Sequence, residues 1–199
     1  MSGEESDTLA DLAERRGLDD DVYGAAEDSR LLADAAVDIV RADWRVLEVG
    51  TGSGYVADRV AGETGATVVA SDLNPHACGL ARERGLDVVR ADLVAPFADD
   101  AFDAVLFNPP YLPTPEDGPW DDWLEVALSG GEDGRAVVAP FLADVGRVLA
   151  PGGVVLLLVS SVTGLDAVRD LAADAGFAVD VAAEESFPYE RLVVLALRG

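Results

Sequence analysis

The sequence predicts an α/β protein with a seven-stranded, doubly wound and mostly parallel sheet whose last strand runs antiparallel. Seven short runs rich in β-branched residues recur along the chain, and most of them alternate with stretches of helical periodicity. The last two runs are joined by a loop without a helical pattern, so the final strand is expected to reverse direction. The 199 residues suit a single domain, and no linker, repeat or low-complexity block divides them.

Helices are expected both before the sheet and between its strands. Residues 7–16 can form a short helix that ends at Gly17. A stronger helix begins at Ser29, a natural N-cap, and its apolar residues recur at helical spacing at positions 31, 32, 35, 36, 39 and 40. The strands are expected at 45–49, 67–71, 86–90, 104–107, 154–159, 179–183 and 192–197. The later helices are expected at 54–63, 75–84, 135–149 and 164–175.

The composition excludes several classes of function. Thirty-eight acidic residues oppose 14 basic ones, giving a net charge of −24, and every basic residue is arginine. Such a field repels nucleic acid and membrane phosphates, and it indicates a salt-loving host with a potassium-rich cytoplasm whose salt screens the repulsion. One cysteine and one histidine give neither a disulfide framework nor a Cys/His zinc site, so no metal is expected. Without a membrane-length apolar run or a signal peptide, the protein is expected in the cytoplasm.

A glycine-rich loop follows the first predicted strand, in the order Glu48-Val49-Gly50-Thr51-Gly52-Ser53-Gly54. Its glycines allow a tight turn from strand to helix and let a ligand lie directly on the backbone. The dinucleotide-binding pattern G-x-G-x-x-G is not met, because Tyr55 stands at the third glycine position. A glycine loop alone is a weak signal, so its meaning depends on what the neighbouring strands carry.

Acidic residues stand at the ends of the next two strands. Asp72, followed by Leu73, is placed to accept both hydroxyls of a ribose. Asp92 and Leu93 follow the third strand, where they could hydrogen-bond an adenine amino group and pack on its ring. In so acidic a chain either acid alone could be a solvated surface group, but successive strand ends together predict a nucleoside site. Over roughly residues 29–199 the chain resembles the class I S-adenosylmethionine-dependent methyltransferases, which implies a Rossmann-like fold and S-adenosylmethionine as cofactor.

The most specific signal in the chain is Phe107-Asn108-Pro109-Pro110-Tyr111, at the end of the fourth strand. Neither proline can donate a backbone hydrogen bond, so the loop offers acceptors and one aromatic face. We expect the Asn108 side-chain oxygen and the Pro109 carbonyl each to accept one N–H of a planar N–H2 group, with Tyr111 stacked on its plane. Two acceptors favour pyramidalisation of that nitrogen and aim its lone pair at the sulfonium methyl. Orientation and preset dipoles would then supply the catalysis without a strong general base.

The N-P-P-Y loop resembles that of both the adenine-N6 methyltransferases and the HemK-like glutamine-N5 methyltransferases. Two stretches favour the HemK-like family in its compact archaeal and eukaryotic form. The run Val22-Tyr23-Gly24-Ala25-Ala26-Glu27-Asp28-Ser29 is similar to the family segment V-Y-x-P-A-E-D-[ST], with Ala25 in place of the usual proline. Gly130-Gly131-Glu132-Asp133-Gly134-Arg135 is similar to its G-G-x-x-G-R segment. Residues 1–28 would form an N-terminal extension and lid, and residues 29–199 the methyltransferase domain.

This resemblance implies a substrate, a partner and a set of sites. The substrate would be the glutamine of the Gly-Gly-Gln loop in a class I translation termination (release) factor, methylated on its side-chain nitrogen. A small zinc-binding activator subunit would form a 1:1 heterodimer with the chain. Cofactor contacts would fall at Ser29, Glu48, Gly50, Thr51, Gly52, Asp72, Leu73, Asp92, Leu93 and Asn108. Substrate contacts would fall at Asn108, Pro109, Pro110 and Tyr111, of which Asn108, Pro109 and Tyr111 would be catalytic.

The third strand is expected at an edge of the sheet, where bare backbone groups would be a liability. The resemblance implies that the activator docks there by extending the sheet, with contacts at Leu86, Val88, Val89 and Arg90. Three other functions agree less well with the sequence. Adenine-N6 methylation of DNA or RNA shares the catalytic loop, but it needs a basic track that this chain lacks. A partner that only binds would not need paired acceptors, and a nicotinamide oxidoreductase would be expected to keep the third glycine.

Overall fold

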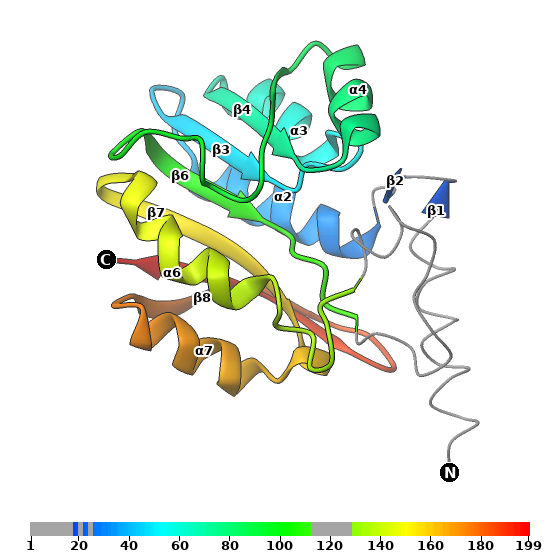
Figure 1. Ribbon diagram of the computed structural model, residues 1–199, viewed down its shortest axis with the longest axis vertical. Helices are drawn as coiled ribbons and strands as arrows, with labels where there is room; N and C mark the ends of the chain where they lie inside the picture. Colours follow the sequence, from blue (N-terminus) through cyan, green and yellow to red (C-terminus); the bar gives the residue numbers. More distant parts are fainter. Residues whose placement is uncertain (1–17, 20–21, 24–25, 113–128) are drawn as a thin grey trace.

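The computed structural model describes residues 18–19, 22–23, 26–112 and 129–199, and it contains the predicted seven-stranded sheet (Figure 1). The predicted helix over residues 7–16 lies outside the described residues. The strands of this sheet are β3 (Arg45–Val49), β4 (Thr67–Asp72), β5 (Asp87–Arg90), β6 (Phe102–Phe107), β7 (Leu149–Ser160), β8 (Ala178–Ser186) and β9 (Arg191–Arg198). They lie in the order β5-β4-β3-β6-β7-β9-β8, and only β9 runs antiparallel to its neighbours. The fold class is therefore confirmed, including the reversed last strand.

The strand order places a switch point in the middle of the sheet. From β3 the chain winds outward through β4 to β5, then returns to add β6 on the other side of β3. Loops that leave β3 and β6 therefore diverge, and a crevice forms beyond the carboxyl ends of these strands. The glycine loop follows β3 and the N-P-P-Y loop follows β6, so the two strongest sequence signals flank one crevice.

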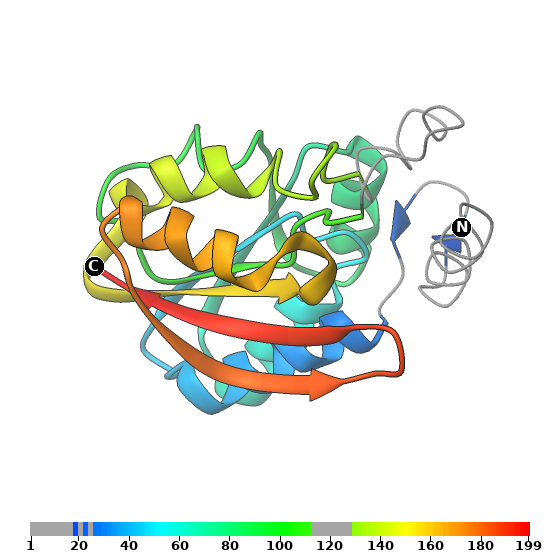
Figure 2. The same ribbon diagram turned by 90° about the horizontal axis from the view of Figure 1, so that it is seen from below.

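Helices cover both faces of the sheet, as Figure 2 shows. Helices α2 (Glu27–Ile39) and α3 (Tyr55–Thr64) pack on one face, and α6 (Val138–Val148) and α7 (Leu165–Asp174) on the other. Helix α4 (Pro75–Glu83) packs against β4 and β5, and a short 3-10 helix, η1 (Ser161–Thr163), follows β7. Because both faces are covered, the central strands are nearly continuous apolar runs rather than alternating ones.

Helix α2 begins earlier than the sequence predicted. Ser29 was expected as its N-cap, but the helix starts at Glu27 and the N-cap position is Ala26, which has an extended backbone and no side-chain cap. Two acidic residues, Glu27 and Asp28, therefore occupy the first turn, where the helix dipole favours negative charge. Ser29 lies inside the first turn. Ahead of the helix, β1 (Leu18–Asp19) and β2 (Val22–Tyr23) pair as a small antiparallel ribbon that was not predicted.

The two edge strands of the large sheet are β5 and β8. The position of β5 at an edge was predicted, and three of its four residues are exposed. Within the described part of the chain, no helix has the length and apolar character needed to cross a membrane.

Candidate active site

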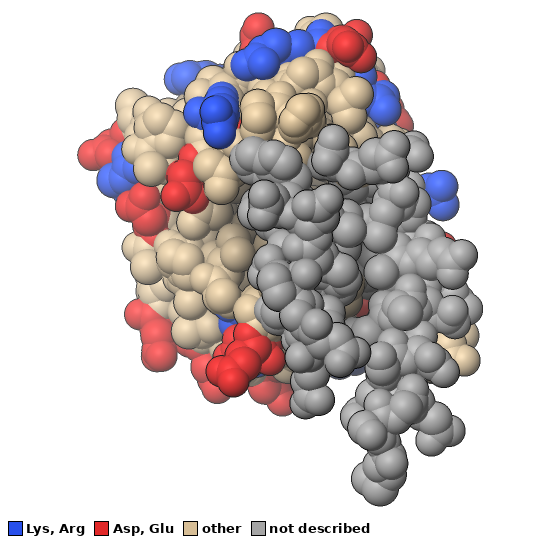
Figure 3. All heavy atoms as spheres, turned by 45° about the vertical axis from the view of Figure 1, so that its right-hand side comes forward, with Lys and Arg blue, Asp and Glu red and all other residues tan. Residues whose placement is uncertain are grey.

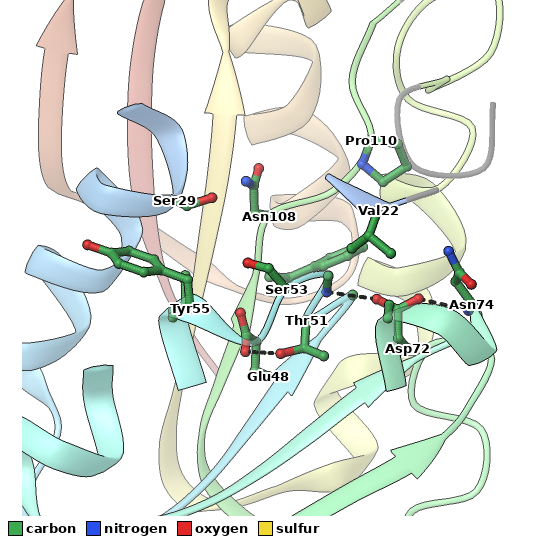
Figure 4. A pocket seen from close by; sticks show the side chains of 15 residues that line it. Val22, Ser29, Glu48, Thr51, Ser53, Tyr55, Asp72, Asn74, Asn108 and Pro110 are labelled. Carbon is green, nitrogen blue, oxygen red and sulfur yellow. Dashed lines mark hydrogen bonds between the residues drawn. The ribbon is translucent and has the colours of Figure 1, made fainter. Parts of the chain in front are cut away.

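A pocket opens at the switch point, between the glycine loop, the N-P-P-Y loop and the start of α2 (Figure 4). It holds about 710 Å³ of empty space, part of it open to solvent. The residues that line it are Val22, Ser29, Glu48, Gly50, Thr51, Gly52, Ser53, Tyr55, Val56, Asp72, Asn74, Ala77, Phe107, Asn108 and Pro110. Eight of the residues predicted to bind cofactor or substrate are thus brought together: Ser29, Glu48, Gly50, Thr51, Gly52, Asp72, Asn108 and Pro110.

The glycine loop is held against the end of β4 by hydrogen bonds. Thr51 donates its N–H to the Ser71 carbonyl at 2.9 Å, and the Gly52 N–H donates to Asp72 Oδ2 at 2.9 Å. The other carboxylate oxygen of Asp72 accepts the Asn74 N–H at 2.8 Å. Gly50 has a φ of +64°, and a Cβ there would lie 3.3 Å from the Phe107 ring. The loop therefore needs glycine for both its backbone and its close approach to β6.

The Asp72 carboxylate is fixed before any ligand arrives. Burial raises its pKa, and the backbone N–H groups of Gly52 and Asn74 oppose that rise. Each carboxylate oxygen has more than one lone pair, so the two backbone bonds leave acceptor capacity that faces the pocket. Figure 4 shows this carboxylate on one side of the pocket, with Ser29 projecting from α2 on the other. The arrangement fits a ligand with neighbouring hydroxyl groups.

Glu48 is a buried acid at the floor of the same pocket. Only 3% of its surface is exposed, and its Oε2 accepts the Thr51 hydroxyl and the Ala57 N–H at 2.5 and 3.0 Å. Burial raises the pKa of Glu48 from 4.5 to about 8; the bonds from Thr51 and Ala57 oppose the shift. At neutral pH this side chain is therefore largely protonated, and it can donate as well as accept a hydrogen bond.

The N-P-P-Y loop, the predicted catalytic loop, carries a buried acceptor at Asn108. Asn108 Oδ1 is buried and has no hydrogen-bond partner among the described residues. A buried acceptor of this kind normally has a partner, so an unpaired one at a pocket wall points to a donor that arrives with a ligand. Pro110 also lines the pocket, whereas Pro109 is buried behind it.

Tyr111 lies differently from the expected stacking position. Its side chain is only 4% exposed and it is not among the residues that line the pocket. Its hydroxyl donates to Asp28 Oδ2 at 3.3 Å, which ties the catalytic loop to the first turn of α2. The ring packs in the core beside Leu112 and the helix, because the loop turns inward after Pro110.

The stretch from Gly130 to Arg135 packs behind this loop. A Cβ on Gly134 would lie 2.7 Å from the Tyr111 carbonyl oxygen, and Gly130 donates its N–H to the Leu112 carbonyl at 2.8 Å. Arg135 donates from Nη1 to the Thr163 carbonyl and from Nη2 to Asp133, which anchors the stretch to the end of β7. The second resemblance segment thus supports the N-P-P-Y loop and does not line the pocket.

Three predicted cofactor residues lie outside the pocket lining. Leu73 is 41% exposed, and Asp92 is also exposed. Leu93 has a positive φ of 48° and packs partly buried against the core. All three follow strand ends at the correct edge of the sheet, and their contacts with the cofactor stay a prediction.

Several lining residues were not predicted from the sequence. Tyr55, Val56, Asn74 and Ala77 begin the helices that follow the glycine loop and Asp72, so their positions in the sequence could have indicated them. Val22 reaches the pocket from a separate ribbon ahead of α2, and the only signal for it was its place in the resemblance segment V-Y-x-P-A-E-D-[ST].

The chain matches known methyltransferases in sequence. Residues 46–128 match a family model described as a methyltransferase domain. A Methanocaldococcus jannaschii protein to which protein N5-glutamine methyltransferase activity is attributed is 38% identical over 184 residues, covering 89% of this chain and 92% of that protein. The human methyltransferase HEMK2 is 35% identical over 158 residues, covering 72% of this chain and 73% of its own length. The release factor glutamine methyltransferase of Gloeobacter violaceus is 37% identical over 183 residues, and the match spans 64% of that longer protein.

The fold matches solved structures as well. A chain of the E. cuniculi Mtq2–Trm112 complex, which methylates the translation termination factor eRF1, superposes with a TM-score of 0.73 at 27% identity. The match covers 89% of this chain and 98% of that one. A methyltransferase from Pyrococcus furiosus superposes over the full length of both chains with a TM-score of 0.67 at 18% identity, which shows the shared fold.

Proposed function

Because this chain belongs to the HemK-like family of protein-glutamine N5-methyltransferases, we propose that it methylates the glutamine of the Gly-Gly-Gln loop in a class I translation termination factor. The methyl donor is S-adenosylmethionine, and the acceptor is the glutamine side-chain nitrogen. The observation that carries the proposal is Asn108 Oδ1, a buried acceptor without a partner among the described residues, at the wall of the pocket.

The pocket fits the cofactor. Asp72 offers a fixed carboxylate for the ribose hydroxyls, and the backbone of the glycine loop lies open to a ligand beside it. Ser29 and the protonated Glu48 add a hydroxyl and a carboxylic acid for the polar end of the amino acid portion. When bound, S-adenosylmethionine supplies an electrophilic methyl group on a sulfonium.

The residues of the catalytic loop would hold the substrate amide in a reactive geometry. Asn108 Oδ1 accepts one N–H of the glutamine amide, and the Pro109 carbonyl accepts the other. With both N–H bonds fixed, the nitrogen lone pair is drawn out of conjugation and directed toward the methyl group. As the N–CH3 bond forms and the methyl–sulfur bond breaks, with the neutral thioether S-adenosylhomocysteine as leaving group, the nitrogen gains positive charge, which the two oxygen dipoles stabilise. One N–H proton then leaves to water. The chain's contribution is orientation and electrostatics rather than general base catalysis.

The test uses radiolabelled S-adenosylmethionine, the enzyme with its activator, and the host release factor beside host DNA and tRNA. We expect label in the release factor only, none in a release factor whose acceptor glutamine is changed to alanine, and almost none with Asn108→Ala. Calorimetry with S-adenosylhomocysteine should show that Asn108→Ala still binds the cofactor product. Label in nucleic acid instead would show adenine methylation, and near-normal turnover by Asn108→Ala would remove this side chain from the mechanism.

The same relatives support a proposal for the partner. We propose that a small zinc-binding activator docks on the outer edge of β5, as a 1:1 heterodimer. Ala91 donates its N–H to the Asp72 carbonyl, so by strand alternation Val88 and Arg90 direct their backbone groups away from β4. Three of the large hydrophobic side chains that are exposed lie along this part of the chain: Leu73, Leu80 and Val89. The Val88 carbonyl accepts from Arg82 Nη2 at 3.3 Å, so an added strand would displace this arginine, pair with the outward backbone groups and cover these side chains.

Charge also distinguishes this part of the surface. Arg82, Arg84 and Arg90 are exposed around the end of α4 and β5, and Figure 3 shows arginines gathered at the end of the molecule where α4 lies. Glu83 and Asp87 are exposed in the same stretch and Arg84 pairs with Asp58, so the arginines largely neutralise this surface. In a chain of net charge −24 such a surface would repel an acidic partner less than the rest of the molecule does. Leu86, also predicted to bind the partner, is only half-exposed and packs against the core, which makes it a support for the edge.

A proline at Val88 tests this docking, because it removes an outward N–H and spares the bonds to β4. We expect Val88→Pro to fold and to lose the activator in co-purification, and Val89→Ser to weaken the complex. Val181→Ser is the matched control, since this valine is exposed on β8 at the opposite edge. A Val88→Pro variant that keeps its activator would show that docking occurs elsewhere.

A further inference from the structure

We propose that Asp28 is a positioning residue for methyl transfer, which sets the catalytic loop by holding the hydroxyl of Tyr111. This rests on the proposed function, because the loop it positions is the one assigned to the glutamine amide. Sequence reasoning gave Tyr111 a stacking role and gave Asp28 none. The structure instead joins these two side chains, which are 83 residues apart in the chain, by a hydrogen bond of 3.3 Å.

The carboxylate of Asp28 serves two segments at once. Its Oδ1 accepts the backbone N–H and the hydroxyl of Ser29 at 2.6 and 3.3 Å, and its Oδ2 accepts the Tyr111 hydroxyl. Ser29 lines the cofactor pocket, whereas Tyr111 directly follows the prolines of the catalytic loop. One carboxylate therefore fixes both the side of the pocket that faces the cofactor and the loop that faces the substrate.

Burial makes this connection stiff. Asp28 is 2% exposed, Ser29 7% and Tyr111 4%, so water competes little for the hydrogen bonds. Asp28 also lies in the first turn of α2, where the helix dipole favours a carboxylate. The backbone carbonyl of Tyr111 is packed against Gly134, which leaves no room for a Cβ on that glycine. The residue after the two prolines is thus held at its hydroxyl and at its backbone.

The consequence for catalysis is geometric. Asn108 and Tyr111 flank two prolines whose φ angles are fixed by their rings, so few backbone angles separate the anchored residue from the catalytic oxygen. Releasing the Tyr111 hydroxyl should let the loop drift and misplace Asn108 Oδ1. Because alignment governs the reaction, such drift lowers kcat more than it changes KM.

The experiment compares Tyr111→Phe with Tyr189→Phe, the same change at a tyrosine that is 62% exposed between β8 and β9. For the enzyme with its activator, we expect Tyr111→Phe to lower kcat by about ten-fold, on the scale of one buried hydrogen bond to a charged group. KM for the release factor and the affinity for S-adenosylhomocysteine should stay close to wild type, and the melting temperature should fall by only a few degrees, because one buried hydrogen bond is lost. Tyr189→Phe should leave all four unchanged. Since Tyr111→Phe keeps the ring, wild-type kcat in that variant would show that stacking is the role and overturn the proposal.

A double-mutant cycle assigns the effect to the pair. Asp28→Asn keeps the shape of the side chain but leaves one acceptor oxygen where two are used. We expect Asp28→Asn to lower kcat and the double variant to be no slower than the slower single variant. Losses that multiply in the double variant would show that the two residues act separately, and would overturn the proposal.

Hydrogen exchange supplies a readout that needs no substrate. In Tyr111→Phe the amides of residues 111 and 112 should exchange about ten-fold faster than in wild type, while those of β6 stay protected. If the wild-type enzyme labels no release factor, the proposed function fails, and exchange alone decides whether Asp28 holds the loop. Unchanged exchange in Tyr111→Phe would overturn the proposal in either case.

Discussion

Replacing Glu48 with glutamine should change how the stability of the protein depends on pH. The pKa of Glu48 is raised from 4.5 to about 8, mainly by burial. Between these values the folded state holds a proton that the unfolded chain releases, so stability falls as pH rises. The stabilising contribution of the proton on Glu48 is fully present below the pKa of the unfolded chain, 4.5. It is lost as pH rises through the pKa of the folded state, about 8. Each pH unit inside this window costs up to about 1.4 kcal/mol, which gives roughly 3 kcal/mol between about pH 5.5 and 7.5.

Glutamine keeps the size of the side chain and can accept from Thr51 and Ala57, but it does not titrate. Urea unfolding at fixed high salt, from about pH 5 to 8, should show wild type losing stability relative to Glu48→Gln as pH rises. Asp72, whose pKa burial also raises, titrates in both proteins, so the difference between the two curves isolates Glu48. Glu83→Gln, which removes one charge at an exposed position, controls for net charge. Parallel curves for wild type and Glu48→Gln would refute the argument that Glu48 is buried as an acid.

Three further predictions concern the pocket and its supports. Asp72→Asn should weaken S-adenosylhomocysteine binding by about 1–3 kcal/mol in calorimetry, because a charged acceptor for the ribose is lost; unchanged affinity would contradict the ribose assignment. Gly134→Ala should lower kcat, because the new Cβ would stand 2.7 Å from the Tyr111 carbonyl oxygen at a φ of +73°. Gly152→Ala is the control: Gly152 has a similar φ of +81° but open space around it, so this variant should retain activity. Cys78 is buried and its thiol pKa is raised mainly by burial, so iodoacetamide should modify it slowly until the protein unfolds; rapid modification of the folded protein would show that the thiol is accessible.

The sequence by itself determined the sheet and the groups at its strand ends. Alternation of β-branched runs with helical periodicity requires a parallel sheet covered on both faces, and parallel strands bring their carboxyl ends to one edge. A glycine loop after β3, an acid after β4 and an asparagine after β6 must then meet in one crevice. The reversal of β9 follows from the same pattern, whereas the edge position of β5 was expected from the strand order usual for class I methyltransferases. Apart from that edge position, these results depend only on local periodicity and on the general geometry of such sheets.

The tertiary structure alone decided which side chains meet across distant segments. Local sequence cannot tell that α2 begins at Glu27, since Ser29 is a much better N-cap by residue type than Ala26, which occupies that position. It cannot pair Asp28 with Tyr111, because that contact depends on how α2 packs on β7, β8 and β9 and on where the loop turns after its prolines. Nor can it show that Glu48 is buried deeply enough to raise its pKa to about 8. Local preferences fix elements and strand ends, whereas burial and side-chain pairing depend on the packing of segments that the chain order keeps far apart.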